Sequence, residues 1–211
     1  MKFSDLDLSK SYTYADYLTW DFPERLELLL GKIFRMSPAP STGHQDLLRK
    51  MIVKLDPYFG KNMCNVFPAP FDVRLPLSPG QVKPEQIDTV VQPDLCVVCD
   101  LSKLDKRGCL GPPDWVIEIM SPGTSKKDAQ QKFDIYQNAG VKEYWMVYPA
   151  EKHIAVFTLN DEGLYIGHRP FVEGDSASPY LFPELVLDLS DLFPPPAWVE
   201  EPYATYMRED D

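Results

Sequence analysis

Asp114-Trp-Val-Ile-Glu-Ile-Met120 carries an acid, Glu118, inside an apolar, β-branched run, and Gln92-Pro-Asp-Leu95 places Asp94 at the start of another. Such runs are typical of buried or half-buried strands. A carboxylate on a buried strand is costly unless it is paired or binds a cation. Asp94 and Glu118 on neighbouring strands would repel each other, and a divalent cation would remove that repulsion. The two runs therefore predict a metal site.

A structural alternative exists for each acid. Asp94 could cap a turn after Pro93, and Glu118 could pair with a surface lysine. For Glu118 alone the two interpretations are evenly balanced, whereas the two acids in this order favour the metal site.

The chain before these runs predicts a short helix, a hairpin, a long helix and a strand. Thr13 and Asp16 have the spacing of a capping box. Gly31-Lys32 lies near the expected hairpin turn, and Ser41 or Thr42 opens the long helix, which Gly60 ends. The expected ranges are 12–20 for the first helix, 24–36 for the hairpin, 41 or 42 to about 59 for the long helix and 66–75 for the strand.

The second half predicts strands around one further helix. Residues 90–98 form a strand interrupted by Pro93, 100–113 a charged loop, and 114–120 the next strand. A helix over 126–138, with Ser125 and Asp128 as a capping-box pair, leads to strands over 143–148 and 154–159. The strand–helix–strand unit over 114–148 should be a right-handed parallel crossover. Shorter strands and turns follow. The order indicates an α/β protein with a mixed sheet flanked by helices, an N-terminal hairpin and C-terminal β decorations.

The length and composition of the chain limit the number of domains and the classes of function that it can have. The 211 residues suit a single domain, with a core over about 12–190 and an acidic tail over 194–211. The net charge of −11 counts against a non-specific nucleic-acid clamp, although it leaves room for a local basic strip. No apolar run approaches the roughly 20 residues of a membrane helix, and residues 1–7 lack the apolar core of a signal peptide. We therefore expect a cytoplasmic protein.

Four cysteines are present, at positions 64, 96, 99 and 109. Cys96 and Cys99 have the spacing of a zinc half-site, but residues three apart on a strand face opposite sides. A cytosolic chain of this size does not need disulfides. Buried free thiols are therefore the favoured interpretation.

Several pieces together resemble the PD-(D/E)XK nuclease superfamily and, more closely, a bacterial family of restriction-endonuclease-like proteins without assigned function. The resemblance covers about residues 12–190. It rests on the order and spacing of these pieces: Leu26-Glu-Leu-Leu-Leu-Gly-Lys-Ile33, Met36-Ser-Pro-Ala-Pro40 with His44, Gln92-Pro-Asp-Leu95, Val116-Ile-Glu-Ile-Met-Ser-Pro122, Asp128 with Lys132 and Tyr136, and Ala139-Gly-Val-Lys-Glu-Tyr-Trp-Met-Val147.

The resemblance implies a restriction-endonuclease-like fold in which Asp94 and Glu118 bind Mg²⁺ or Mn²⁺. Carboxylates are hard oxygen ligands, and Mg²⁺ takes one or two of them while keeping several waters. The superfamily pattern expects a lysine two residues after the second acid, where this chain has Met120. The closer family supplies a lysine from the following helix, which implies Lys132. The alternative for Lys132 is an exposed ion pair with Asp128, four residues earlier.

Glu27 and His44 complete the candidate site. The resemblance implies that Glu27 lies near the active site as a metal or water ligand, whereas its leucine neighbours slightly favour an outward side chain. His44, at the start of the long helix, is either functional or a local cap or surface residue.

These features predict a magnesium-dependent endonuclease that hydrolyses DNA. A double-strand cut needs two active sites, so a homodimer is expected, and Trp145, Phe157, Tyr165 and Phe171 could form its apolar surface or could be core residues. The main alternative is a nuclease-fold binding or assembly protein without catalysis, which Met120 and the acidic charge favour. A hydrolase of smaller phosphate esters is a third candidate. The distance of the Lys132 ammonium from the two carboxylates separates the first two, because charges beyond a Debye length of roughly 8 Å are screened.

Overall fold

The N-terminal region consists of a short helix and a hairpin. The computed structural model describes residues 3, 6–36, 40–60, 64–78, 80, 82–121 and 126–193. Helix α1 (Tyr14–Tyr17) begins after Thr13, whose N–H donates to Asp16 Oδ2 at 2.8 Å, as the capping box predicts. Strands β1 (Leu26–Leu29) and β2 (Lys32–Arg35) form the predicted hairpin. Its turn places Leu30 and Gly31 at φ 51° and 76°, which suits a primed hairpin turn.

The largest sheet, here called sheet B, has the order β12-β11-β10-β9-β6-β3, with β13 also pairing β11. Its strands β9 and β10 are parallel and are joined by helix α3 (Lys126–Ala139), as the crossover prediction required. The other strand pairs are antiparallel. The bounds are β3 Asn65–Pro68, β6 Leu95–Val98, β9 Trp115–Ile119, β10 Glu143–Tyr148, β11 His153–Leu159, β12 Tyr165–Gly167 and β13 Phe171–Val172.

A second sheet, sheet A, has the order β2-β1-β5-β4-β8-β7. Its remaining strands are short: β4 Val73–Arg74, β5 Val90–Val91, β7 Leu104–Asp105 and β8 Gly108–Leu110, with 3-10 turns η2 (Pro84–Gln86) and η3 (Leu101–Lys103) between them. Strands β14 (Ser176–Ala177) and β15 (Leu187–Asp188) form a separate pair before helix α4 (Leu189–Leu192).

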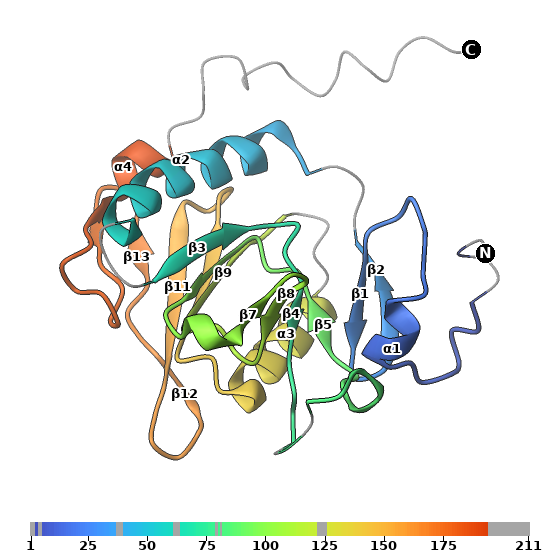
Figure 1. The fold of residues 1–211 in the computed structure, drawn as a ribbon. Helices are drawn as coiled ribbons and strands as arrows, with labels where there is room; N and C mark the ends of the chain where they lie inside the picture. The colour runs from blue at the N-terminus through green and yellow to red at the C-terminus, as the bar shows by residue number, and fades with distance from the viewer. Residues whose placement is uncertain are drawn as a thin grey trace, which may run out of the picture.

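Both faces of sheet B are covered. Helix α2 (Thr42–Phe59), capped by Ser41 and ended by Gly60 as predicted, packs with α4 over the face that carries Trp115, Ile117 and Ile119. Helix α3 and residues of sheet A cover the face that carries Val116. Figure 1 shows α2 and α4 lying together, apart from α3. Alternate residues of β9 therefore contact different layers, and Glu118 belongs to the α3 face. The fold is the predicted mixed α/β arrangement.

Three local predictions are wrong. The strand expected over 66–75 is two strands, β3 and β4, which belong to different sheets. The predicted interruption of 90–98 at Pro93 is confirmed, but the two halves are β5 of sheet A and β6 of sheet B and so are not one strand. The charged loop expected over 100–113 contains η3, β7 and β8. In each case the chain passes between sheets, which the local residue pattern does not record. The capping pair Ser125–Asp128 and the tail 194–211 lie outside the described residues and side chains.

The aromatic residues considered for a dimer surface belong to the core. Trp145 is fully buried, and Phe157, Tyr165 and Phe171 are partly buried against the same two clusters. Among the described residues, no helix is both long and apolar enough to cross a membrane.

The cysteines depart in part from the expectation of free thiols. Cys96 and Cys109 are free and buried, as predicted. Cys64 and Cys99 form a disulfide between the ends of β3 and β6, because the antiparallel register that pairs Asn65 with Val98 brings them opposite each other. Cys99 is thereby paired with Cys64, so the zinc half-site with Cys96 is wrong.

Candidate metal centre

Asp94 and Glu118 lie on neighbouring antiparallel strands. The register pairs Leu95 with Ile117, and its next step brings Asp94 opposite Glu118 on the same face. Asp94 Oδ2 accepts the Ile119 N–H at 2.8 Å, which fixes the carboxylate against β9. The two acids therefore meet at one end of sheet B, where β6 begins and β9 ends.

Glu118 is a buried carboxylate held by two donors from α3. Its Oε1 accepts the Tyr136 hydroxyl at 2.7 Å and the Lys132 ammonium at 3.0 Å. Burial raises the pKa of Glu118 to about 7; the Lys132 charge opposes this rise, while the charges of Asp94 and Glu27 add to it. Glu118 thus has the electrostatics of a group that gains from a nearby cation.

Lys132 connects the two sheets. Its ammonium lies 2.9 Å from Glu27 Oε1 as well as 3.0 Å from Glu118 Oε1. Burial lowers the pKa of Lys132, but the Glu118 and Glu27 carboxylates outweigh it, so the pKa is raised and the ammonium stays charged. The side chain is 17% exposed, so the interpretation of Lys132 as an exposed partner of Asp128 is wrong.

Glu27 points inward, and the expectation of an outward side chain is wrong. All four residues of β1 are buried, because this strand has layers on both sides. Glu27 Oε1 accepts the Lys132 ammonium and also the backbone N–H of Gln92 at 2.8 Å. Sheet A thereby contributes a third carboxylate to the neighbourhood of Glu118.

His44 lies in the first turn of α2 and approaches the site from the opposite helix layer. It is buried, and its Nε2 lies 3.2 Å from Asp94 Oδ2. Burial lowers the pKa of His44, but the hydrogen bond and charge of Asp94 prevail and raise it. His44 is therefore neither a surface residue nor only a helix cap; it is a partner of the Asp94 carboxylate.

A family model matches most of the chain. The family described as "Putative restriction endonuclease" (Uma2) matches residues 14–190. The chain belongs to the Uma2 family. No curated protein matches it.

A solved structure supports the fold of this Uma2 protein. The crystal structure of a "putative nuclease belonging to DUF820" from Anabaena variabilis ATCC 29413 superposes with a TM-score of 0.66 at 21% sequence identity, covering 86% of this chain and 97% of the other. The fold is therefore restriction-endonuclease-like, as the sequence predicted.

Met120 stands where the superfamily pattern expects a lysine, and the structure shows which residue supplies the positive charge instead. Met120 is partly buried against the α3-side cluster, and its N–H donates to the Val147 carbonyl at 2.8 Å. The ammonium beside Glu118 comes instead from Lys132, one helix later.

Two residues near the site, Tyr136 and Gln92, were named in the sequence analysis only as parts of the family resemblance, with no task assigned to them. Tyr136 donates to Glu118, and its spacing of four residues from Lys132 was the available signal. Gln92 binds Glu27 through its backbone N–H, a contact that no side-chain pattern reveals.

The residues present fit a hard divalent cation. Within the described residues, the hydrogen bonds to these carboxylates converge on one oxygen of each, Asp94 Oδ2 and Glu118 Oε1. Each carboxylate has a second oxygen that can bind a cation. The described part of the chain contains no cluster of three or more acidic, histidine or cysteine ligands that could hold a metal. Two carboxylates with waters match Mg²⁺ better than a metal that requires a complete protein ligand set.

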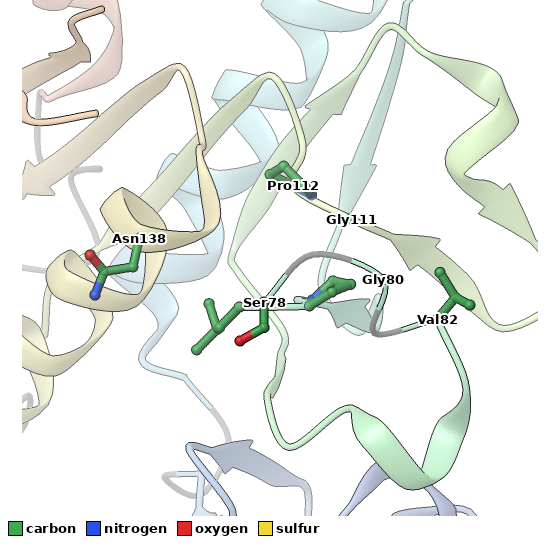
Figure 2. A pocket seen from close by; sticks show the side chains of 8 residues that line it. Ser78, Gly80, Val82, Gly111, Pro112 and Asn138 are labelled. Carbon is green, nitrogen blue, oxygen red and sulfur yellow. The ribbon is translucent and has the colours of Figure 1, made fainter. Parts of the chain in front are cut away.

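A separate, mainly apolar pocket of about 410 Å³ lies beside the end of α3. Figure 2 shows Asn138 on one side and Gly80, Val82, Gly111 and Pro112 on the other. None of the five predicted site residues lines it, so it is distinct from the candidate metal centre.

Proposed function

We propose that this Uma2 protein is a metal-dependent endonuclease that hydrolyses phosphodiester bonds of DNA, with Mg²⁺ or Mn²⁺ held by Asp94 and Glu118. The observation that carries the proposal is the Lys132 ammonium 3.0 Å from Glu118, well inside the distance at which the catalytic interpretation would weaken. An ammonium bridging acids from two sheets is costly to bury, and a surface pair would have served stability equally well.

Each side chain has a distinct task in this proposal. A cation held by Asp94 and Glu118 would supply Lewis-acid polarisation of the phosphate and would lower the pKa of a bound water. Lys132 offers a fixed positive charge for the negative charge that develops on the phosphate oxygens. Glu27 holds the Lys132 ammonium from the other sheet, and Tyr136 fixes one oxygen of Glu118. His44 fixes Asp94 and gives it a proton-bearing neighbour.

We also propose a homodimer, since cutting both strands requires two such centres. The described residues do not identify its interface, because the aromatic side chains considered for it are core residues. Cytoplasmic location stays a prediction, and the Cys64–Cys99 disulfide is a pairing more typical of oxidising compartments.

The decisive experiment compares the wild type with Asp94→Asn and Glu118→Gln on plasmid DNA with Mg²⁺ or Mn²⁺. Asp161→Asn, in an exposed turn, is the matched control. We expect cleavage by the wild type and the control, and loss of cleavage and of calorimetric Mn²⁺ binding in both site variants. Equal residual nicking by all four proteins would refute the enzymatic proposal. A small phosphodiester cleaved in place of plasmid would favour the hydrolase of smaller esters.

The second candidate is a nuclease-fold binding protein without turnover, which Met120 at the usual lysine position favours. It predicts Mn²⁺ or DNA binding by the wild type with no cleavage in either metal.

A further inference from the structure

Arg25 shares a strand face with Glu27. The Met36 N–H donates to the Arg25 carbonyl at 3.0 Å, so the pairing of the hairpin continues one step before β1. Residues two apart on a strand project from the same face. The Arg25 side chain therefore emerges beside Glu27, one pleat closer to the start of the strand, and it is exposed whereas Glu27 is buried.

The guanidinium is fixed by a neutral acceptor. Arg25 Nε and Nη2 donate to the side-chain oxygen of Gln92 at 3.2 and 2.8 Å. The backbone N–H of the same Gln92 donates to Glu27 Oε1 at 2.8 Å. Gln92 thus ties Arg25 to the carboxylate that holds Lys132, two residues before Asp94.

The Gln92 amide is itself held in one orientation. Its Nε2 donates to Asp72 Oδ1 at 2.8 Å and lies 3.4 Å from the Tyr17 hydroxyl. Reversing the amide would face its NH₂ group toward the guanidinium and lose both sets of bonds. The buried network therefore presents its oxygen to Arg25 and holds the exposed cation at the edge of the site.

The positive charge of Arg25 is not consumed by an ion pair. Arg49 pairs with Asp46 at 2.7 Å, and Arg74 pairs with Asp105 at 2.8 Å. By contrast, no acid of the described residues lies within ion-pair distance of Arg25. Asp72 and Glu27, the acids of this network, are each reached through Gln92. A guanidinium has five N–H donors and Gln92 engages two of them, which leaves three that, as far as the described residues go, can bind an incoming anion.

We propose that Arg25 binds a backbone phosphate of the DNA strand beside the phosphate being cleaved. This inference rests on the proposed function and specifies how the substrate is held. A fixed guanidinium fork recognises phosphate oxygens through two bonds and carries no base information. It also provides a local positive group in a chain whose net charge is −11.

The test measures anisotropy of a short fluorescein-labelled duplex over a range of NaCl concentrations, with Ca²⁺ to prevent cleavage. Each phosphate contact contributes a slope of about 0.9 to the dependence of log K on log salt, so losing one weakens binding about eightfold near 0.1 M salt. We expect Arg25→Gln to show both changes. Arg25→Lys should retain the slope and bind more weakly than the wild type, because the fork is lost. Arg169→Gln, exposed near β12 at the far edge of sheet B, should match the wild type.

The outcomes separate the two proposals. An Arg25→Gln slope equal to that of a DNA-binding wild type would overturn the Arg25 assignment and leave the endonuclease intact. A wild type that does not bind duplex DNA would overturn both. Thermal unfolding of each variant detects a purely structural role of Arg25, which would lower the midpoint without changing the salt slope. If Arg25→Gln does not fold, Arg25→Lys with unchanged affinity would refute the assignment.

Discussion

Lys132 Nζ lies 2.9 Å from Glu27 Oε1, although 105 residues separate the two in the chain. The contact joins α3 to sheet A, and the same ammonium reaches Glu118 on sheet B. One cation thereby neutralises acids from two layers, and its removal should affect stability and chemistry together.

Lys132→Met should reduce DNA cleavage by about 100-fold or more, because a fixed positive charge beside the reacting phosphate is lost. Denaturant unfolding should show a loss of about 3 kcal/mol, since two buried acids lose their partner. Lys142→Met is the control: its pair with Asp114 is 2.7 Å long, but Lys142 is 61% exposed, so a change of at most about 1 kcal/mol and full activity are expected. Undiminished cleavage by Lys132→Met would remove Lys132 from the mechanism.

Glu118→Gln should be more stable than the wild type at pH 8 in EDTA. The folded pKa of Glu118, about 7, exceeds its ordinary value of 4.5, so the folded state binds more protons than the unfolded state between these values. Wild-type stability should therefore fall as pH rises through this window, by on the order of 2–3 kcal/mol. Urea unfolding at pH 5 and 8 measures the difference. The exposed variant Glu162→Gln should keep the wild-type pH dependence, and a Glu118→Gln protein that also keeps it would contradict the assignment.

Tyr136→Phe should weaken Mn²⁺ binding by about 10-fold or more, because Glu118 Oε1 loses the Tyr136 hydroxyl that donates to it and orients the carboxylate. Tyr165→Phe is a matched control, since its buried hydroxyl has no hydrogen-bond partner among the described residues. Calorimetric titration should give wild-type affinity for Tyr165→Phe. Equal affinities for all three proteins would show that the Tyr136 hydroxyl does not position the ligand.

Reduction of the Cys64–Cys99 disulfide should destabilise the protein. The bond closes a segment with a sequence separation of 35, for which chain entropy gives about 4 kcal/mol. Cys64→Ser should show the same loss without reductant, and reductant should not change its stability further. Thiol titration of the unreduced protein in denaturant should detect Cys96 and Cys109 alone; four reactive thiols would contradict the pairing.

Capping residues and turn glycines predicted the helices and turns whose bounds depend on residues close together in the sequence. Ser41 or Thr42 as the opening residue and Gly60 as the stop predicted a helix that the structure confirms over Thr42–Phe59. The hairpin around Gly31 and the parallel pair of β9 and β10 were predicted for similar reasons. The division of 66–75 was not predictable, because which sheet each half joins depends on partners far along the chain.

For the candidate site, too, the sequence predicted which residues take part but not all of their contacts. Its five members were named from the sequence, but the inward side chain of Glu27 was not, since a strand covered on both sides has no polar face to reveal its orientation. The hydrogen bond from the Gln92 backbone to Glu27 is invisible to any side-chain pattern. The family resemblance supplied what periodicity could not.

The contacts among Glu27, Glu118 and Lys132 also determine when the site can exist. In the order of synthesis, Glu27 and Glu118 both precede Lys132, which contacts them both. A chain that ends before Lys132 lacks the ammonium that contacts acids of both sheets. In the proposed function, such a chain would hold the two carboxylates without the positive charge assigned to the cleavage step.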